Sequence, residues 1–222
     1  MGLSGEQFFQ VRQCLDDGCR FRFPVRAGSE VGERCPRCGA GTEFVTEPFG
    51  GHRIERPSQS PTFVIEAVLD NIRSAFNVGA IFRTADGAAV SQLHLCGMTA
   101  TPDNPRLAKT ALGAEKRVSW QYYNNALDAA GQLKGKGYRL WAVEGGERAE
   151  SLFDVTTELT ELPNAPILLI VGNELAGIDP DLLDLCNRVL YIPMYGRKSS
   201  LNVEVAFGIA AYRLRENLDR LP

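Results

Sequence analysis

Four cysteines within the first 40 residues constrain the fold of this 222-residue chain more than any other feature. They are Cys14, Cys19, Cys35 and Cys38, spaced as C-x4-C-x15-C-x2-C. The second pair lies in CPRCG, where proline and glycine bend the backbone so that two thiolates face one ion. Four thiolates suit the tetrahedral coordination of a closed, structural Zn²⁺ site. A unit of roughly 45 residues builds little core, so metal binding is expected to supply its folding free energy.

We interpret residues 1–46 as a zinc-ribbon-like domain, in which the alternating segment FRFPV forms a strand. The alternative, a redox or disulfide cluster, is less favoured because cysteine pairs in a cytosolic chain are more often metal ligands. Residues 47–61 are rich in proline, glycine and serine and show no periodicity, which is typical of a linker. Cys96 and Cys186, which lie outside the cluster, are expected to be small buried hydrophobes.

Composition excludes several classes of protein. Apolar residues make up 44% of the chain and charged residues 23%, so wholesale disorder is excluded. The longest apolar run, residues 165–171, is far shorter than a membrane span, and the N-terminus shows no basic-then-apolar signal pattern. We therefore expect a cytoplasmic protein with no membrane partner.

The net charge of −3 excludes nonspecific binding of polyanions through an overall positive charge. Residues 1–60 nevertheless carry eight arginines, no lysine and eight acidic residues. Any contact with nucleic acid must therefore use a local patch rather than bulk charge. The arginine bias fits phosphate recognition by guanidinium forks, and it equally fits a GC-rich coding sequence. Both readings stay open at this stage.

Residues 62–222 alternate between strand-like and helix-like segments, which predicts an α/β domain with a mostly parallel sheet between helices. The continuous apolar run at 165–171 is typical of a strand covered on both faces. The expected strands are 62–69, 91–96, 118–123, 138–143, 165–171 and 188–192. The expected helices are 77–88, 106–114, 124–134, 179–185 and 202–216.

A sheet of this kind binds ligands beyond the carboxyl ends of its strands. Glycine-containing turns follow strands at Gly145–Gly146, Gly172 and Gly196. The sequence contains no G-x-G-x-x-G after the first strand and no G-x-x-x-x-G-K-[ST] anywhere. Dinucleotide-binding and P-loop functions therefore lose their main sequence support.

Three segments go beyond a generic α/β pattern: LDNIRSAFNVGAIFRTAD at 69–86, LLIVGNELAGI at 168–178, and VLYIPMYGRKSSLNVEVAFGIAAYRL at 189–214. In this order and spacing they resemble the three signature motifs of the SpoU branch of the SPOUT methyltransferases. KTALGAE at 109–115 is similar to the segment between the first two motifs. The resemblance covers about residues 62–218 and leaves the N-terminal 60 residues unexplained.

The resemblance implies a SPOUT fold with a C-terminal trefoil knot, an exception to the general absence of knots. It also implies a homodimer that binds S-adenosylmethionine and methylates a ribose 2′-hydroxyl in tRNA or rRNA. No DNA partner is expected. Two alternatives remain: a non-catalytic RNA-binding protein that keeps the fold, and a methyltransferase that acts on a base.

The resemblance also assigns site residues. The expected catalytic residues match the three motifs: Arg83, Asn77, Glu174, Ser200 and Asn202. Gly172 is expected to let backbone approach the cofactor, and apolar residues of the third motif are expected to frame adenine. The full set of expected cofactor contacts is Ala142, Glu144, Val171, Gly172, Ile192, Met194, Leu201 and Asn202.

Four of the five catalytic assignments have a purely structural alternative. The guanidinium of Arg83 is a poor base, so we favour a role in holding the phosphate and the hydroxyl, although a base role stays open. As a structural residue, Arg83 would pair with Asp86 on the same helix face. Asn77 and Ser200 are both plausible helix N-caps. Glu174 would be a solvated acid in a turn.

Basic residues provide candidate phosphate contacts. In the second domain these are Arg73, Lys109, Lys116, Arg117, Arg197 and Lys198, each of which would otherwise be a solvated surface charge. In the zinc-ribbon-like domain they are Arg20, Arg22, Arg26 and Arg37. That domain is the best candidate for an accessory RNA-binding domain, because proteins recognise structured RNA largely through its backbone and shape. Alternatively, it only stabilises a dimer or binds another protein.

Overall fold

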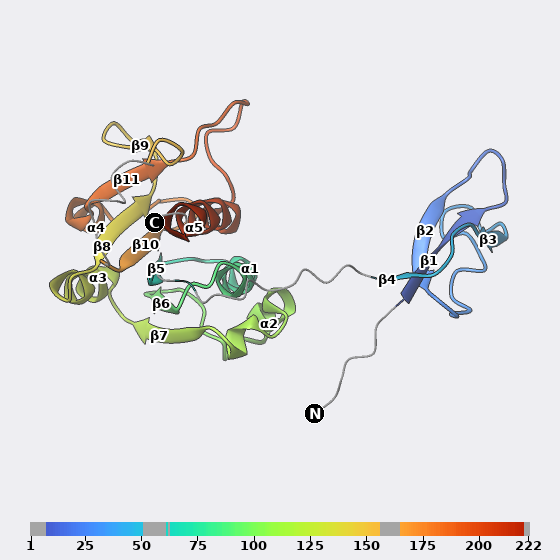
Figure 1. The fold of residues 1–222 in the computed structure, drawn as a ribbon, viewed down its shortest axis with the longest axis horizontal. Coiled ribbons are helices and arrows are strands. Elements are labelled where there is room, and N and C mark those ends of the chain that lie inside the picture. The colour runs from blue at the N-terminus through green and yellow to red at the C-terminus, as the bar shows by residue number, and fades with distance from the viewer. Residues whose placement is uncertain (1–7, 51–60, 62, 156–164, 220–222) are drawn as a thin grey trace. The chain divides into compact units, whose positions relative to one another are not determined.

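The computed structural model describes residues 8–50, 61, 63–155 and 165–219. The chain divides into two compact units, residues 1–59 and 60–222, and each is treated by itself (Figure 1). Most of the expected linker, residues 51–60, lies outside the described residues. Among the described helices, none combines the length and apolarity needed to cross a membrane.

The N-terminal unit is a small antiparallel sheet with the strand order β2-β1-β3, in which β4 also pairs with β1. Its strands are β1 (Phe8–Cys14), β2 (Arg22–Arg26), β3 (Thr42–Phe44) and β4 (Phe49–Gly50). The alternating FRFPV segment was the one strand expected here, and it lies at β2. Strand β4 falls within the segment expected to be linker, so the sheet extends beyond residue 46.

The second unit is built on a seven-stranded sheet with the order β7-β6-β5-β10-β8-β11-β9, and all its pairings are parallel. The prediction of a mostly parallel sheet is confirmed. Strand β9 was not expected, because two residues show no periodicity. The strands are β5 (Ile65–Asp70), β6 (Gln92–Cys96), β7 (Ser119–Tyr123), β8 (Arg139–Val143), β9 (Glu150–Ser151), β10 (Ile167–Val171) and β11 (Arg188–Tyr191).

Helices cover both faces of this sheet, as Figure 1 shows. Helices α1 (Ala75–Gly87), α2 (Pro105–Ala111) and α5 (Val203–Asp219) contribute to one apolar core. Helices α3 (Ala126–Gly135) and α4 (Pro180–Leu185) contribute to the other. A 3₁₀ turn, η1 (Ala114–Lys116), follows α2. Alternate residues of β10 enter the two cores, so the central strand is buried on both sides.

The helix boundaries depend on capping. Helix α1 begins at Ala75, two residues before the predicted start, because the Ser74 hydroxyl accepts a hydrogen bond from the Asn77 N–H. The Ser74 side chain is therefore the N-cap, and the alternative role of Asn77 as the cap is wrong.

His94, on β6, is 2% exposed and bonded through its Nε2 to Glu66, which agrees with a structural role.

Candidate functional site

A cleft of about 780 Å³ opens at the carboxyl ends of β8, β10 and β11, beside the N-termini of α1 and α5. A volume of this size lies in the range of small-molecule sites. Ten of the predicted site residues line this cleft, and they come from all three motifs and from the end of β8. They are Asn77, Glu144, Val171, Gly172, Glu174, Ile192, Met194, Ser200, Leu201 and Asn202.

Hydrogen bonds connect the three motifs along one wall of the cleft. The Asn202 amide donates to the Asn77 Oδ1 at 3.4 Å, and the Asn77 amide donates to the Glu174 carboxylate at 2.9 Å. The same carboxylate accepts the backbone N–H groups of Arg73 and Ser74 at 2.9 and 3.1 Å. Glu174 is thus fixed on the free N–H groups that precede α1, and it is not the freely solvated acid of the structural alternative.

The environment of Glu174 keeps it ionised. Burial alone would raise its pKa, but the N–H groups of Arg73, Ser74 and Glu174 itself, together with the Asn77 amide, outweigh burial and lower the pKa. The carboxylate therefore contributes stability above its ordinary pKa, and this contribution is lost as the pH falls through the lowered value.

Replacing Glu174 with glutamine should reveal this contribution. Near neutral pH, Glu174→Gln is expected to lower the free energy of unfolding by on the order of 1 kcal/mol, a modest value because the carboxylate is solvent-screened. The difference from the wild type should start to shrink below the ordinary glutamate pKa of about 4.3, and it should vanish only once the pH has fallen through the lowered pKa of the folded-state carboxyl. Urea denaturation across this pH range measures it, with Glu147→Gln as the control because Glu147 is exposed. A difference that persists unchanged at pH 3 would contradict this explanation.

Gly172 is required by a tight turn that follows β10. Asn173 and Gly177 exchange two backbone hydrogen bonds of 2.9 Å each, which folds residues 173–177 back on themselves. A Cβ at Gly172 would lie 2.4 Å from the carbonyl carbon and oxygen of Gly177. The expectation that Gly172 exists to admit a cofactor is therefore incomplete, because the chain itself already occupies the space of a side chain.

Gly172→Ala should therefore disturb both the turn and the cleft. The clash is with backbone, which cannot move without breaking the 173–177 pairing, so we expect a loss of about 2 kcal/mol in the free energy of unfolding. Gly145→Ala is the matched control, since Gly145 also lines the cleft and its Cβ would meet nothing within 4 Å. Thermal or urea unfolding of the two variants checks this, and equal stability would contradict it.

Two residues at the end of β8 differ from the expectation. The Glu144 carboxylate accepts the backbone N–H groups of Ile178 and Gly145 at 3.1 and 3.0 Å, so it braces the turn after β10. Ala142 is fully buried in the core under α3 and does not line the cleft. The reason is strand alternation, because adjacent side chains point to opposite faces and Val143 takes the cleft position.

Asp70 and Asn71 are positioning residues that the sequence analysis missed. Asn71 adopts a left-handed conformation and accepts the Asn173 amide on its carbonyl at 2.8 Å. The Asp70 carboxylate, 3% exposed, accepts the Asn71 amide at 2.7 Å and the Asp179 N–H at 3.3 Å. Burial raises the pKa of Asp70 despite these bonds. The sequence signal was a polar pair immediately after an apolar strand.

The third motif supplies the remaining wall. Asn202 caps α5, because its Oδ1 accepts the Glu204 N–H at 3.1 Å. Ser200, the alternative cap, lies two residues earlier and is exposed at the rim of the cleft. Ile192 packs against the apolar core while also lining the cleft, as expected for a residue that presents an apolar wall.

Arg83 is the one expected catalytic residue that does not line the cleft of its own chain. It is exposed on α1, six residues after Asn77. Six residues turn a helix through about 600°, which leaves the two side chains on different sides of α1. Both were expected to be catalytic residues of one site, but within a single chain they do not line the same cleft. Asp86, the partner of Arg83 in the structural alternative, accepts two hydrogen bonds from Arg117, at 3.1 and 2.7 Å.

Most candidate phosphate contacts are exposed on the second unit. Lys109 lies on α2 and Lys116 in η1. Arg197 and Lys198 belong to the segment before α5 that also supplies part of the cleft. Arg117 differs, because its charge is already paired with Asp86.

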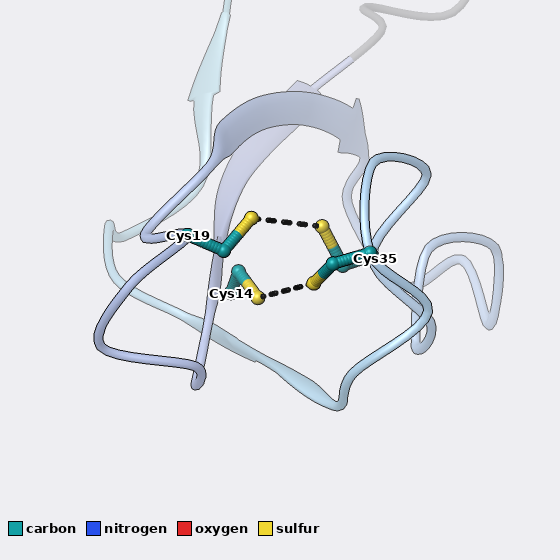
Figure 2. A group of neighbouring side chains, drawn as sticks. Cys14, Cys19 and Cys35 are labelled. Atoms are coloured by element: carbon teal, nitrogen blue, oxygen red, sulfur yellow. Dashed lines mark hydrogen bonds between the residues drawn. The ribbon is translucent and has the colours of Figure 1, made fainter.

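The four cysteines of the N-terminal unit converge, with all four Sγ atoms within 4.8 Å of one another. The Sγ atoms of Cys14 and Cys38 are 3.4 Å apart, and those of Cys19 and Cys35 are 3.8 Å apart. Figure 2 shows the thiols of Cys14, Cys19 and Cys35 pointing into one space. Four sulfurs bound to Zn²⁺ at about 2.3 Å would lie about 3.8 Å from one another, so the cluster fits a tetrahedral ion.

The fold and the cleft together define an α/β protein with a cleft of ligand size at the carboxyl edge of a parallel sheet. A family model, the SpoU rRNA Methylase family, matches residues 65–212. The chain belongs to this family, as the three motifs indicated.

Two curated relatives illustrate the match. The chain is 31% identical over 144 residues to a tRNA (guanosine(18)-2′-O)-methyltransferase of Aquifex aeolicus, covering 64% of each protein. It is 32% identical over 151 residues to a 23S rRNA (guanosine(2553)-2′-O)-methyltransferase of Bacillus subtilis, covering 67% of this chain and 56% of the relative. The match thus spans less than two thirds of the length of either relative.

Solved structures agree with the fold. An AdoMet-bound rRNA methyltransferase from Sinorhizobium meliloti superposes with a TM-score of 0.64 at 25% identity, covering 77% of this chain and 64% of that one. The TrmH/SpoU tRNA modifying enzyme of A. aeolicus gives a TM-score of 0.61 at 27% identity, covering 69% and 74%. These matches support the parallel sheet and its helices as a SPOUT fold.

Proposed function

We propose that this protein transfers a methyl group from S-adenosylmethionine to a ribose 2′-hydroxyl in tRNA or rRNA. The observation that carries the proposal is the cleft whose wall is the hydrogen-bonded series Asn202, Asn77 and Glu174, one residue from each motif. The relatives named above act on tRNA and rRNA at guanosine 2′-oxygens. The C-terminal trefoil knot is part of the proposal.

The residues of the cleft fit the cofactor. Val171, Ile192, Met194 and Leu201 offer apolar surface of the kind that an adenine ring requires. The loops after β8 and β10 bring backbone groups and glycines to the same cleft. When bound, S-adenosylmethionine supplies the activated methyl group, and the protein supplies position and electric field.

The chain's own residues have three tasks in this reaction. The 2′-oxygen must lie in line with the methyl group, its proton must leave, and the neighbouring phosphate must be held. We assign the phosphate and the hydroxyl to Arg83, because a guanidinium is a strong two-pronged donor and a poor base. Asn77, Glu174 and Asn202 hold the loops in register, and we assign contact with the substrate to Ser200, which lines the cleft.

A homodimer is part of the proposal, because Arg83 is exposed and does not line the cleft of its own chain. Phe76 and Arg83 are seven residues apart on α1, so they lie on the same side of the helix, and both are exposed. Val205 and Tyr212 show the same spacing on α5 and are 40% and 53% exposed. Exposed apolar side chains on two packed helices, here Phe76, Val205 and Tyr212, are suited to contact with a second copy.

A structural Zn²⁺ held by Cys14, Cys19, Cys35 and Cys38 completes the proposal. The convergence of four thiolates favours it over a disulfide pair, since all four cysteines are free. Elemental analysis of the purified protein should find one zinc per chain.

The function is tested by incubating the protein with methyl-labelled S-adenosylmethionine and total tRNA or rRNA. We expect label in RNA, and we expect the modified position to resist alkaline cleavage, because only a methylated 2′-oxygen prevents strand scission. Label at a position that alkali still cleaves would indicate a base methyltransferase. Failure to bind S-adenosylmethionine in a calorimetric titration would instead favour the non-catalytic RNA-binding alternative.

A further inference from the structure

The register of the N-terminal sheet separates its side chains into two faces. In antiparallel pairing, directly opposed residues share a face. Pairing therefore places Phe9 with Arg26 and Phe49, and Gln13 with Arg22 and Glu43. We call this side the outer face. It consists of Phe9, Val11, Gln13, Arg22, Pro24, Arg26, Glu43 and Phe49.

The opposite face holds the small core of the unit. Arg12, Cys14 and Val25 lie there and are 7%, 3% and 8% exposed. The Arg12 guanidinium packs over the Phe44 ring at 4.2 Å and donates to Thr42 at 2.8 Å. Around Arg12, Cys14 and Val25 the inner face is therefore filled by the unit itself, while Phe8 and Phe44 on the same face are 46% and 42% exposed.

The outer face, by contrast, is open in the part of the chain that the structure describes. None of its residues falls in the buried class, and Phe49 is 44% exposed. The rings of Phe9 and Phe49 lie 6.4 Å apart in a tilted pair. Aromatic rings on a small, otherwise solvated sheet are not needed by the core, so they are available to a partner.

Two arginines lie on β2, with Arg26 directly opposite Phe9 and Arg22 opposite Gln13. Arg22 and Arg26 are both exposed and, four residues apart on one strand, are separated by about 13 Å. The ion pairs found among the described residues include neither of them. The one acid on this face, Glu43, lies on β3, at the far side of β1 from β2. The β2 side of the outer face therefore carries uncompensated positive charge beside the half-buried ring of Phe9, which in turn contacts the exposed ring of Phe49.

We propose that the outer face binds a single-stranded segment of the RNA substrate, with bases stacked on Phe9 and Phe49 and phosphates paired with Arg22 and Arg26. Stacking platforms lined by basic groups are the general chemistry of single-strand binding. The proposal rests on the function proposed above, because it takes the ligand to be that enzyme's RNA. Arg20 and Arg37, also candidates from the sequence, lie in the loops beside the cysteines and off this face.

The test measures RNA binding by the full-length protein without cofactor. The probe is a fluorescein-labelled, 12-nucleotide, mixed-sequence single-stranded RNA, and the readout is fluorescence anisotropy at several salt concentrations. Phe49→Ala should weaken binding about tenfold. The double variant Arg22→Gln/Arg26→Gln should also weaken it, and should reduce the slope of log K against log salt by about 1.4.

Matched controls separate the outer face from general effects. Phe8→Ala removes a phenylalanine of nearly equal exposure, 46%, from the other face of the sheet, on the adjacent strand β1. Arg20→Gln/Arg37→Gln removes the same charge from the cysteine loops. Both controls should bind within twofold of the wild type. Unchanged unfolding transitions confirm that each variant is folded.

Three outcomes would overturn the inference: no binding by the wild type, unchanged binding by both outer-face variants, or an effect of Phe49→Ala on oligomeric state but not on RNA affinity. The last would identify a protein contact. Methyl transfer by the same wild-type preparation reports on the proposed function separately. If transfer occurs while the outer-face variants bind normally, only the inference fails. If binding changes as expected and no transfer occurs, only the proposed function fails.

Discussion

Arg83→Ala is expected to abolish methyl transfer while leaving folding and cofactor binding nearly intact. Arg83 is exposed on α1 and lies outside the cleft, so its removal should not disturb the walls that hold the cofactor. Its guanidinium would instead hold the phosphate and the hydroxyl of the RNA. Loss of a group that positions and polarises the reacting atoms should lower kcat by about 100-fold or more.

The measurement combines methyl transfer with a calorimetric titration of S-adenosylmethionine. Arg83→Lys should recover only part of the rate, because a lysine keeps the charge but loses the planar fork. Arg139→Ala is the control, since Arg139 is exposed at the amino end of β8, the opposite end of the strand from the cleft. Normal turnover by Arg83→Ala would remove this residue from the reaction.

A mixing experiment then asks which cleft Arg83 serves. If Arg83 of one copy acts at the cleft of the other, an equal mixture of the Arg83→Ala and Gly172→Ala proteins forms heterodimers with one complete site. Exchanged subunits should then regain about a quarter of wild-type activity. If Arg83 acts at its own cleft, the heterodimer has no complete site and no activity returns.

The sheet and its helices could be predicted from the sequence because each strand has a local signature. The run at 165–171 is apolar at every position, as a strand between two helical layers must be, and it became β10 at the centre of the sheet. The residues around the cleft could be named because the motifs come from loops at the carboxyl ends of such strands. Strands of two or three residues, such as β9 and β4, have no periodicity to read.

The roles of side chains were harder to predict than their positions. The direction of Arg83 relative to Asn77 follows from helix geometry because both residues lie within α1, but which of the two faces the cleft depends on how α1 packs against the sheet. The bracing roles of Glu144 and Glu174 depend on backbone N–H groups that are distant in sequence. Glycine is likewise required at position 172 because the backbone of Gly177 occupies the space of a side chain there, and this contact exists only in the folded turn. Pairings of this kind leave no local pattern.

Cysteine substitution in the N-terminal unit should have the largest effect on folding. Among its described residues, the buried apolar side chains are Cys14, Val25 and Cys35. So small a core cannot offset the conformational entropy of ordering the 8–50 segment. Binding of a structural zinc ion contributes about 10–16 kcal/mol in comparable peptides, so the fold of this unit should depend on the metal.

Cys38→Ser is the decisive variant, because Cys38 is exposed. If Cys38 were only a surface residue, its replacement by serine would change stability by about 0.5 kcal/mol or less. As a zinc ligand it should be essential, and the variant should lose the metal and unfold residues 8–50. Hydrogen exchange of the full chain should show this loss of protection while residues 63–155 stay protected, and a strong chelator should have the same effect on the wild type. Cys186→Ser, at a half-buried cysteine outside the cluster, should keep its zinc. Full protection of residues 8–50 in Cys38→Ser would contradict the metal site, because Cys38 would then behave as an ordinary exposed surface residue.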